Sequence, residues 1–427
     1  MRRKNRPFAN MTGREWQNLA IAALMALYVI QIGLDAAWGN IFSHLSIDFA
    51  SFWSAGYIAD HFGYVRVYDL ATMQKVQEQL WPKTAAAAAG FQVVPTPYLP
   101  LFLIAFQPFA LLQPVPASWI WMALNLVVTV LYLRYFSIRI SGQAPQTRLL
   151  AMLLVSVPVF SNIFVGQVNS WLMICVGQYM LATEEGKSFN AGLWLGGLLL
   201  KPQCLVLIVP ALLLQRSVRS LAGFTAAGVA VGAVSWAMVG SAGLIQIARL
   251  WLGYAGGMAT NYPELMMNWR MVGLLVAQFA GRSLASSVTV IAMILTMVAA
   301  LYLWRNSPSG DPRRFSPALL GTLAATGLVA WHAHVHMAMI LLPPLVWMYL
   351  RQREILGHAL DWWVFFPAAI YSARLILASL AQVGALAISG GALDFLGGMG
   401  LFMMNLFLLM WAARRLQRPA TLVSTAA

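Results

Sequence analysis

Asp48 is the residue whose type and position most strongly suggest chemistry. It stands in the run IDFASFW, residues 47–53, just after the first long apolar segment of the chain. A carboxylate at a hydrophobic edge can have a raised pKa, which suits a general base that removes a proton from a hydroxyl group. Alternatively, Asp48 caps a helix that begins at Phe49, because aspartate is a favoured residue at that position. The local pattern leaves both interpretations open.

Three of the six histidines lie within five residues, in the run WHAHVH that ends at His336. His332 and His336 are four residues apart and would share one face of a helix, whereas His334 would point elsewhere. Paired imidazoles can bind zinc, but no carboxylate stands nearby in the sequence, so we expect no metal. The remaining interpretations are a partner for a phosphate or sugar hydroxyl, and histidines that simply pack at the membrane interface.

Several polar side chains interrupt apolar segments. Gln167 and Asn169 lie in the run GQVNS, and amides inside a membrane are costly unless they form hydrogen bonds, so they either bind sugar hydroxyls or join helices. Lys201, followed by Pro202, lies in the middle of a long apolar segment. It could contact an anionic headgroup, form a buried ion pair, or extend its ammonium group to the interface. Arg270, in the run NWR, suits bidentate binding of a phosphate.

The composition is that of an integral membrane protein. Hydrophobic residues make up 60% of the chain and charged residues 9%, and the mean hydropathy is +0.71. We therefore expect one all-α membrane domain over residues 1–427. The net charge of +14 does not indicate nucleic-acid binding, because the basic residues form short clusters between apolar segments, where they orient helices. Both cysteines lie in apolar segments, which predicts buried thiols rather than a disulfide.

The apolar segments predict about twelve membrane spans and an external active face. The expected spans are 17–37, 99–113, 117–137, 149–165, 169–183, 189–214, 221–240, 285–304, 317–331, 337–350, 361–380 and 396–413. The first external loop would be 38–98, with amphipathic helices after Asp48 and Asp69 and a low-complexity link at 84–90. The second would be 241–284, with 271–280 as a candidate re-entrant segment.

One observation fits this count poorly. Arg134, Arg139 and Arg148 fall between spans that it places outside the cytoplasm. Either the segment 99–113 does not cross the membrane, or these arginines bind something anionic on the outer side.

An ordered set of short motifs resembles glycosyltransferase family 87, a family of polytopic enzymes of the GT-C type. The motifs are DFxxFWxAG from Asp48, VYD at 67–69, PYxPL at 97–101, GQVN at 166–169, LKP at 200–202, NWR at 268–270 and HAH at 332–334. The nearest relatives by function are the mycobacterial members that build phosphatidylinositol mannosides.

The resemblance implies an inverting transferase that uses polyprenyl-phosphate sugars, typically mannose. It makes Asp48 the base and His334 the best match to a histidine of the family's site, with His332 and His336 as alternatives. The candidate residues for binding the donor phosphate or the sugar are Arg270, Lys201, Gln167, Asn169, His332, His336, Asp69 and Tyr98. Asp69, like Asp48, could instead be a helix cap. We expect no cofactor and no metal, because Asp48 is followed by Phe49 and not by a second acid.

The expected activity is transfer of a sugar, most often mannose, from a polyprenyl phosphate to a lipid or glycan hydroxyl. The site would face the periplasm or cell exterior from the plasma membrane and serve glycolipid synthesis in the cell envelope, with membrane lipids and no nucleic acid as partners. The alternative is a transporter or flippase for a lipid-linked or anionic solute, because Lys201, Gln167 and Asn169 would suit broken helices around a substrate. A third hypothesis is a non-catalytic subunit of an envelope assembly.

Overall fold

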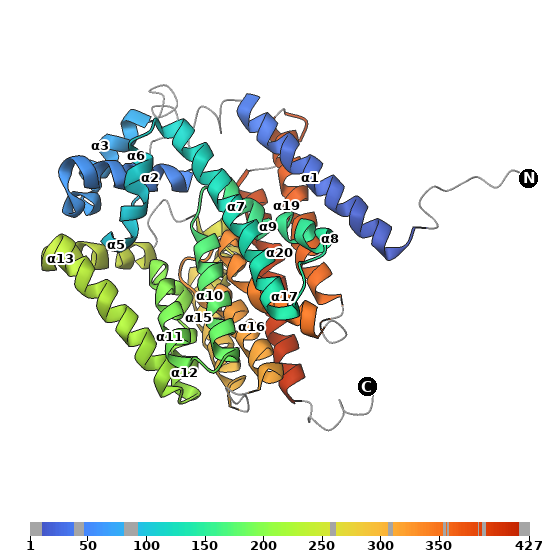
Figure 1. Cartoon of the computed structure of the whole chain (residues 1–427). Helices are drawn as coiled ribbons and strands as arrows, with labels where there is room; N and C mark the ends of the chain where they lie inside the picture. Colours follow the sequence, from blue (N-terminus) through green and yellow to red (C-terminus); the bar gives the residue numbers. More distant parts are fainter. Residues whose placement is uncertain are drawn as a thin grey trace, which may run out of the picture.

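The structure is a computed structural model that describes residues 11–37, 47–80, 93–256, 262–305, 311–352, 356, 358–382, 384–386 and 390–417. In these parts of the chain the secondary structure elements are all helices, joined by short turns (Figure 1). Six helices within them are long and apolar enough to cross a membrane, or seven if the bent pair α8 (Thr147–Leu154) and α9 (Val157–Phe164) forms one span. The six are α1 (Gly13–Ala37), α7 (Pro114–Ser141), α13 (Val218–Gly256), α15 (Arg282–Tyr302), α19 (Ala359–Gln382) and α20 (Gly390–Gln417). The chain is therefore a polytopic helical membrane protein.

The prediction of twelve spans is not supported, because several apolar segments are too short or too broken to cross by themselves. The clearest case is 99–113, which forms α5 (Pro100–Leu103), η2 (Ile104–Phe106) and α6 (Gln107–Ala110). Proline stands in the first turn of both α5 and α6 and cannot continue a preceding helix. A crossing helix needs about 20 residues, so these pieces instead pack against α2 (Ile47–Phe62).

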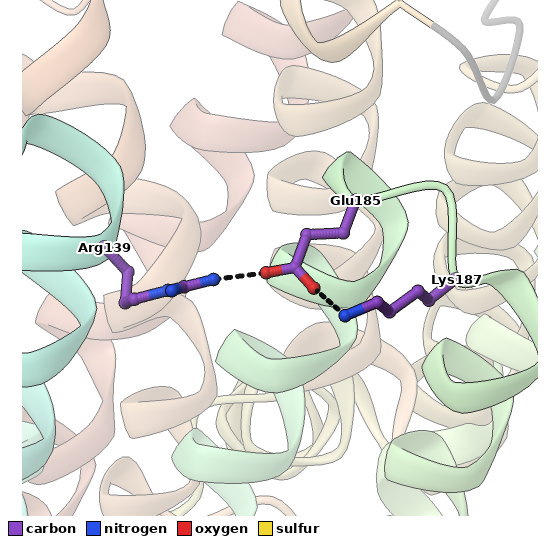
Figure 2. Close-up of polar contacts among 3 residues, drawn as sticks. All are labelled: Arg139, Glu185 and Lys187. Atoms are coloured by element: carbon purple, nitrogen blue, oxygen red, sulfur yellow. Dashed lines mark hydrogen bonds and ion pairs between the residues drawn. The ribbon is translucent and has the colours of Figure 1, made fainter.

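An ion-pair cluster shows which helix ends lie together (Figure 2). Glu185 follows α10 (Asn169–Glu184) and pairs both with Arg139, near the end of α7, and with Lys187 at 2.8 Å. The C-terminal ends of α7 and α10 therefore lie at the same end of the molecule. The first explanation for the poorly fitting arginines, that 99–113 does not cross the membrane, is supported by the division of that segment into the short pieces α5, η2 and α6.

The predicted span 189–214 is a helical hairpin. It comprises α11 (Ser188–Gly196), η3 (Gly197–Leu200), η4 (Pro202–Leu205) and α12 (Ile208–Leu214). Gly192 packs on Ser220 of α13 and Gly196 packs on Ala227, so α11 and α13 run parallel. A Cβ at Gly192 would lie 1.9 Å from the Ser220 carbonyl oxygen, so only glycine permits this approach. Since α11 and α13 begin at the same end, the residues between them must return, which leaves Lys201 at the turn of the hairpin.

A second hairpin forms the buried centre of the protein. Its arms are α16 (Pro312–Val329) and the pair η7 (Val335–Leu341) and α17 (Leu342–Arg351). Most side chains of these arms are buried, and α16 packs along α20 while η7 packs on α9 and α10. The arms meet at residues 330–334, so the histidine run lies at the turn of this hairpin.

The two helices predicted in the first loop are confirmed as α2 and α3 (Leu70–Leu80), joined by η1 (Tyr64–Tyr68). Figure 1 shows α2, α3 and α6 together at one corner of the molecule. Phe49 and Phe52 are fully buried and contact Phe109 and Phe106. The link at 84–90 lies outside the described residues. The candidate re-entrant segment forms α14 (Trp269–Ala280), a helix of 12 residues that packs on α15.

Candidate active site

Two adjoining cavities meet at Asp48. The space not filled by atoms is about 610 Å³ in the first and about 910 Å³ in the second, with the part open to solvent included. They share the lining residues Asp48, Val94, Gln167 and His332. The first is also lined by Ser51, Phe52, Pro95, Pro97, Tyr98, Leu200, Lys201, Pro202, Gln203, Trp251 and Trp331. The second is also lined by Ser161, Val165, Tyr262, Leu265, His334, Val335, His336, Tyr371, Arg374 and Gly397.

Asp48 lies in the first turn of α2, one residue after the helix begins. The buried Phe49 and Phe52 fix this turn, and the carboxyl group opens onto both cavities. Burial raises the pKa of Asp48, while the hydrogen bond with Gln167 and the positive charge of Lys201 act in the opposite direction. Asp48 is thus a carboxylate in a protein-enclosed setting, with one polar and one cationic neighbour, as a general base requires.

Gln167 reaches Asp48 from a tight turn between α9 and α10. Gly166 has φ 74°, a left-handed conformation that glycine adopts without strain, and its carbonyl oxygen accepts from Trp121 Nε1 at 2.7 Å. The backbone N–H of Gln167 donates to the Asn162 carbonyl oxygen at 2.9 Å. The Gln167 side chain accepts from the Val168 N–H at 3.3 Å through Oε1 and also hydrogen-bonds Asp48.

Asn169 has a different role from Gln167, although both belong to one motif. Its backbone N–H and side-chain amide donate to Asn162 Oδ1, at 3.0 and 2.9 Å. Asn162 in turn donates to Ser170 Oγ at 3.1 Å. Asn169 joins α9 to α10 and lines neither cavity, whereas Gln167 lines both. Asn169 therefore joins helices, as one interpretation of the motif predicts, whereas binding of sugar hydroxyls by Gln167 stays a prediction.

Lys201 is a buried cation at the turn of the first hairpin. Its backbone is extended, with φ −134° and ψ 86°, and it separates η3 from η4. The side chain is only 4% exposed, lines the first cavity and interacts electrostatically with Asp48. Backbone that is not helical is tolerated at membrane depth where it lines a cavity. The break at Lys201-Pro202 thus delivers one positive charge to the first cavity.

The NWR and histidine motifs pair with each other through the backbone. Met267 N–H donates to the Ala333 carbonyl oxygen at 2.9 Å, and Asn268 Nδ2 donates to the Ala330 carbonyl oxygen at 2.8 Å. Arg270 donates through its guanidinium to the Trp331 carbonyl oxygen. Arg270 does not line either cavity. Two motifs some 60 residues apart therefore form one unit, in which Arg270 holds the histidine turn.

The prediction that His332 and His336 share a helix face is wrong. The pairing just described keeps residues 331–334 out of helical conformation, and η7 begins only at Val335. His332 and His334 are in contact, with ring centroids 4.7 Å apart, and all three histidines line the second cavity. His332 also lines the first cavity, and burial lowers its pKa well below the ordinary value, which keeps the ring neutral. No group of three potential metal ligands occurs among the described residues.

Of the other predicted residues, Tyr98 lies in the site and Asp69 does not. Tyr98 lines the first cavity, and its carbonyl oxygen accepts from Tyr68 OH at 2.7 Å. Asp69 lines neither cavity and caps α3, where it accepts from Thr72 Oγ1 at 2.6 Å. The Thr72 bond is the main reason that the Asp69 pKa is lowered.

The motifs gave no indication of Arg374 in the second cavity. It extends from α19, pairs with Asp394 of α20 at 2.6 Å and lines that cavity with Tyr371. An arginine inside an apolar helix is a signal for a functional position, and the sequence carries that signal. The motifs also gave no indication of Trp251 of α13, which lines the first cavity. Its Nε1 donates to the Pro97 carbonyl oxygen at 2.7 Å.

A scan of protein-family models matches residues 96–331 to glycosyltransferase family 87, which is more than half of the chain. The chain belongs to glycosyltransferase family 87. It is therefore a membrane glycosyltransferase, and the suspected resemblance is confirmed. The matched residues of family 87 include Tyr98, Gln167, Lys201 and Arg270, while Asp48 and the three histidines lie outside them. Searches of curated proteins and of solved structures found no match.

Replacement of Asn268 by alanine should destabilise this family 87 enzyme by about 1–3 kcal/mol, because the buried Ala330 carbonyl loses its donor and α14 loses its cap. Thermal unfolding in a fixed detergent would measure the change. Replacement of the exposed Asn190 by alanine is the matched control. Equal melting temperatures for both variants would contradict a supporting role for Asn268.

Proposed function

We propose that the enzyme transfers a sugar, most often mannose, from a polyprenyl phosphate to a hydroxyl group of a lipid or glycan, with inversion. The observation that carries the proposal is the position of Asp48 where two cavities meet, with Lys201 on one side only. A displacement reaction needs a base beside the nucleophile and a positive charge beside the leaving group. The two cavities supply these groups to two different substrates.

The first cavity suits the donor. Lys201 provides a cation for the phosphate, and Tyr98, Trp251 and Trp331 provide aromatic surface for the sugar and the first prenyl units. The second cavity suits the acceptor, since it presents histidines, tyrosines and Arg374 to a polar group. In this arrangement the acceptor hydroxyl lies on Asp48 and faces the anomeric carbon across the shared boundary.

The proposed reaction is a single displacement. Asp48 accepts the proton of the acceptor hydroxyl as its oxygen forms a bond to the anomeric carbon. The bond from that carbon to the phosphate oxygen breaks on the opposite face, and its electron pair remains on the phosphate. Lys201 stabilises the resulting charge, and neutral His332 can donate a hydrogen bond at the same boundary. Binding both substrates in adjoining cavities supplies part of the rate through proximity.

This mechanism gives Lys201 the role that the sequence suggested for Arg270. Arg270 already donates to the Trp331 carbonyl oxygen, so we assign it to positioning the residue beside His332. Asn169 and Asp69 are likewise assigned to the scaffold, because each has a structural hydrogen-bond partner and neither lines a cavity.

The basic residues support an external site. Lys187 follows the end of α10, and Arg139 of α7 reaches the same end through Glu185, so about 24 Å of helix separates this cluster from Gln167. Arg219 and Arg351 lie at the corresponding ends of α13 and α17. Positive residues favour the cytoplasmic side, so we place the cavities toward the periplasm or cell exterior of the plasma membrane.

The test is release of free polyprenyl phosphate by the purified enzyme. The enzyme would be incubated with a panel of polyprenyl-phosphate sugars and extracted cell lipids, and the products followed by mass spectrometry. We expect release with one sugar, together with an acceptor whose mass increases by that sugar. Movement of a lipid-linked sugar across vesicles without release of phosphate would instead favour the transporter hypothesis.

Replacement of Gln167 by leucine should move the acidic limb of the pH–rate profile to higher pH. The hydrogen bond from Gln167 lowers the pKa of Asp48, so its removal raises that pKa further. A base must be deprotonated, and a higher pKa makes activity disappear earlier as the pH falls. Gln203→Leu is the matched control, because Gln203 lines the same cavity. A profile that moves equally in both variants would contradict the assignment.

A further inference from the structure

A third cavity lies apart from the two at Asp48. It lies between α1, α8, α17 and α19, and the space in it not filled by atoms is about 1450 Å³, with the part open to solvent included. Its polar lining residues are Arg14, Gln17, Arg148, His358 and Asp361. Its apolar lining is mainly aromatic, and we call its residues, Tyr349, Trp362, Phe365, Phe366 and Ala369, the aromatic wall. Gly13 also lines it.

This cavity lies toward the other end of the helices from the active site. Asp361 and Arg374 belong to the same helix, α19, and 13 residues of helix separate them by about 20 Å. Arg374 lines the second catalytic cavity, whereas Asp361 lines this one. Figure 1 shows α1, α8 and α19 side by side on one flank of the molecule. A ligand here would not compete with the sugar donor or acceptor.

The charges of this cavity favour an anion. Asp361 is the one carboxylate on its described lining, and its Oδ2 already accepts from Gln17 Nε2 at 2.7 Å and contacts His358 Nδ1 at 3.2 Å. Arg14 and Arg148 reach the cavity from different helices, and neither forms an ion pair within the described parts of the chain. Two guanidinium groups from separate helices suit a phosphate, which each can bind with two N–H groups.

The aromatic wall gives the anion an apolar extension. Trp362 is 61% exposed, and it lies on the same helix as Phe365, Phe366 and Ala369, which also line the cavity. Helix α1 packs against α8 and α19, and the cavity lies where these helices meet. A cavity between membrane helices that is lined by two arginines and by aromatic side chains suits a phospholipid with its phosphate at the interface and its chain along the helix.

We propose that this cavity binds an anionic glycerophospholipid. Its phosphate lies between Arg14 and Arg148, and its acyl chain lies along Trp362 and Phe366. A lipid bound here bridges α1 to α19 and stabilises the folded protein increasingly as the lipid concentration rises above its dissociation constant. The proposal is independent of the assignment of Asp48, because no residue of this cavity lines the other two.

The test is lipid binding by the purified enzyme in detergent, measured by native mass spectrometry. Phosphatidylglycerol and phosphatidylcholine with identical chains would be titrated separately, and soluble glycerol phosphate would be added at the same concentrations. The test variant is the double replacement Arg14→Ala with Arg148→Ala. The control is Arg134→Ala with Arg219→Ala, which removes the same charge from exposed arginines that do not line this cavity. Melting temperatures without lipid would establish that both variants fold.

We expect wild type to bind the first phosphatidylglycerol molecule about tenfold more tightly than phosphatidylcholine, which corresponds to about 1.4 kcal/mol. The test variant should lose this preference, and the control should keep it within about twofold. Equal affinities for the two lipids in wild type, or equal losses in both variants, would overturn the proposal. Binding of glycerol phosphate as tight as that of the lipid would also overturn it, because the aromatic wall would then contribute nothing.

Discussion

Replacement of Asp48 by asparagine is expected to lower transfer by about 10²–10⁴-fold, the usual contribution of a general base. The two side chains have nearly the same shape, so the buried turn at Phe49 and the hydrogen-bonding position beside Gln167 are retained. Only the ability to accept a proton is lost. The measurement is the rate of polyprenyl phosphate release at saturating donor, with binding of the donor determined separately.

The matched control for Asp48 is Asp69→Asn, since Asp69 is an acid of the same loop that caps α3. It should leave the stability almost unchanged and the rate within about threefold, because asparagine caps a helix about as well as aspartate does. If Asp48→Asn retained the wild-type rate, Asp48 would not be the base, and the position where the cavities meet would need another explanation.

Replacement of Lys201 by methionine is expected to lower the rate by about 10²–10³-fold, as removal of one group that stabilises transition-state charge usually does. Methionine fills a similar volume at the turn of the hairpin but leaves the departing phosphate without its cation. Lys201 also lowers the pKa of Asp48, so the acidic limb of the profile should move to higher pH in the same variant. Lys201→Arg retains the positive charge and should keep the limb in place while losing part of the rate.

These two readouts separate catalysis from folding. A variant that merely misfolds loses rate at every pH and does not move the limb. Lys187→Met is the control, because Lys187 lies in the ion-pair cluster at the other end of α10 (Figure 2). A wild-type rate in Lys201→Met would contradict the assignment of the donor phosphate to the first cavity.

The sequence predicted where the apolar helices lie better than how they cross the membrane. Hydropathy reports that a segment is buried away from water, and it cannot distinguish a crossing from a hairpin arm. The segment 189–214 is apolar enough for one span, yet Lys201-Pro202 divides it into two arms. Only the packing of Gly192 on Ser220, which is not local in sequence, shows the direction of the second arm.

The sequence likewise predicted some residues of the candidate site and not others. Asp48, Gln167, Lys201 and His332 could be found because a polar residue in an apolar chain is costly and therefore informative. Arg270 and Asp69 carry the same signal, but they satisfy their hydrogen bonds within the scaffold. Arg374 is a cavity residue that was not predicted, because it belongs to no motif and enters the second cavity from a helix late in the chain.

The pairing of residues 266–270 with residues 330–334 also bears on the order in which the enzyme is made. Asp48, Gln167 and Lys201 leave the ribosome well before Ala333 does. Until then the Met267 amide and the Asn268 side chain lack their partners. The boundary between the cavities is therefore finished late in biosynthesis, when the central hairpin inserts among helices that are already present. A chain that stops before Ala330 therefore lacks the carbonyl groups that hold residues 266–270 against the histidine turn.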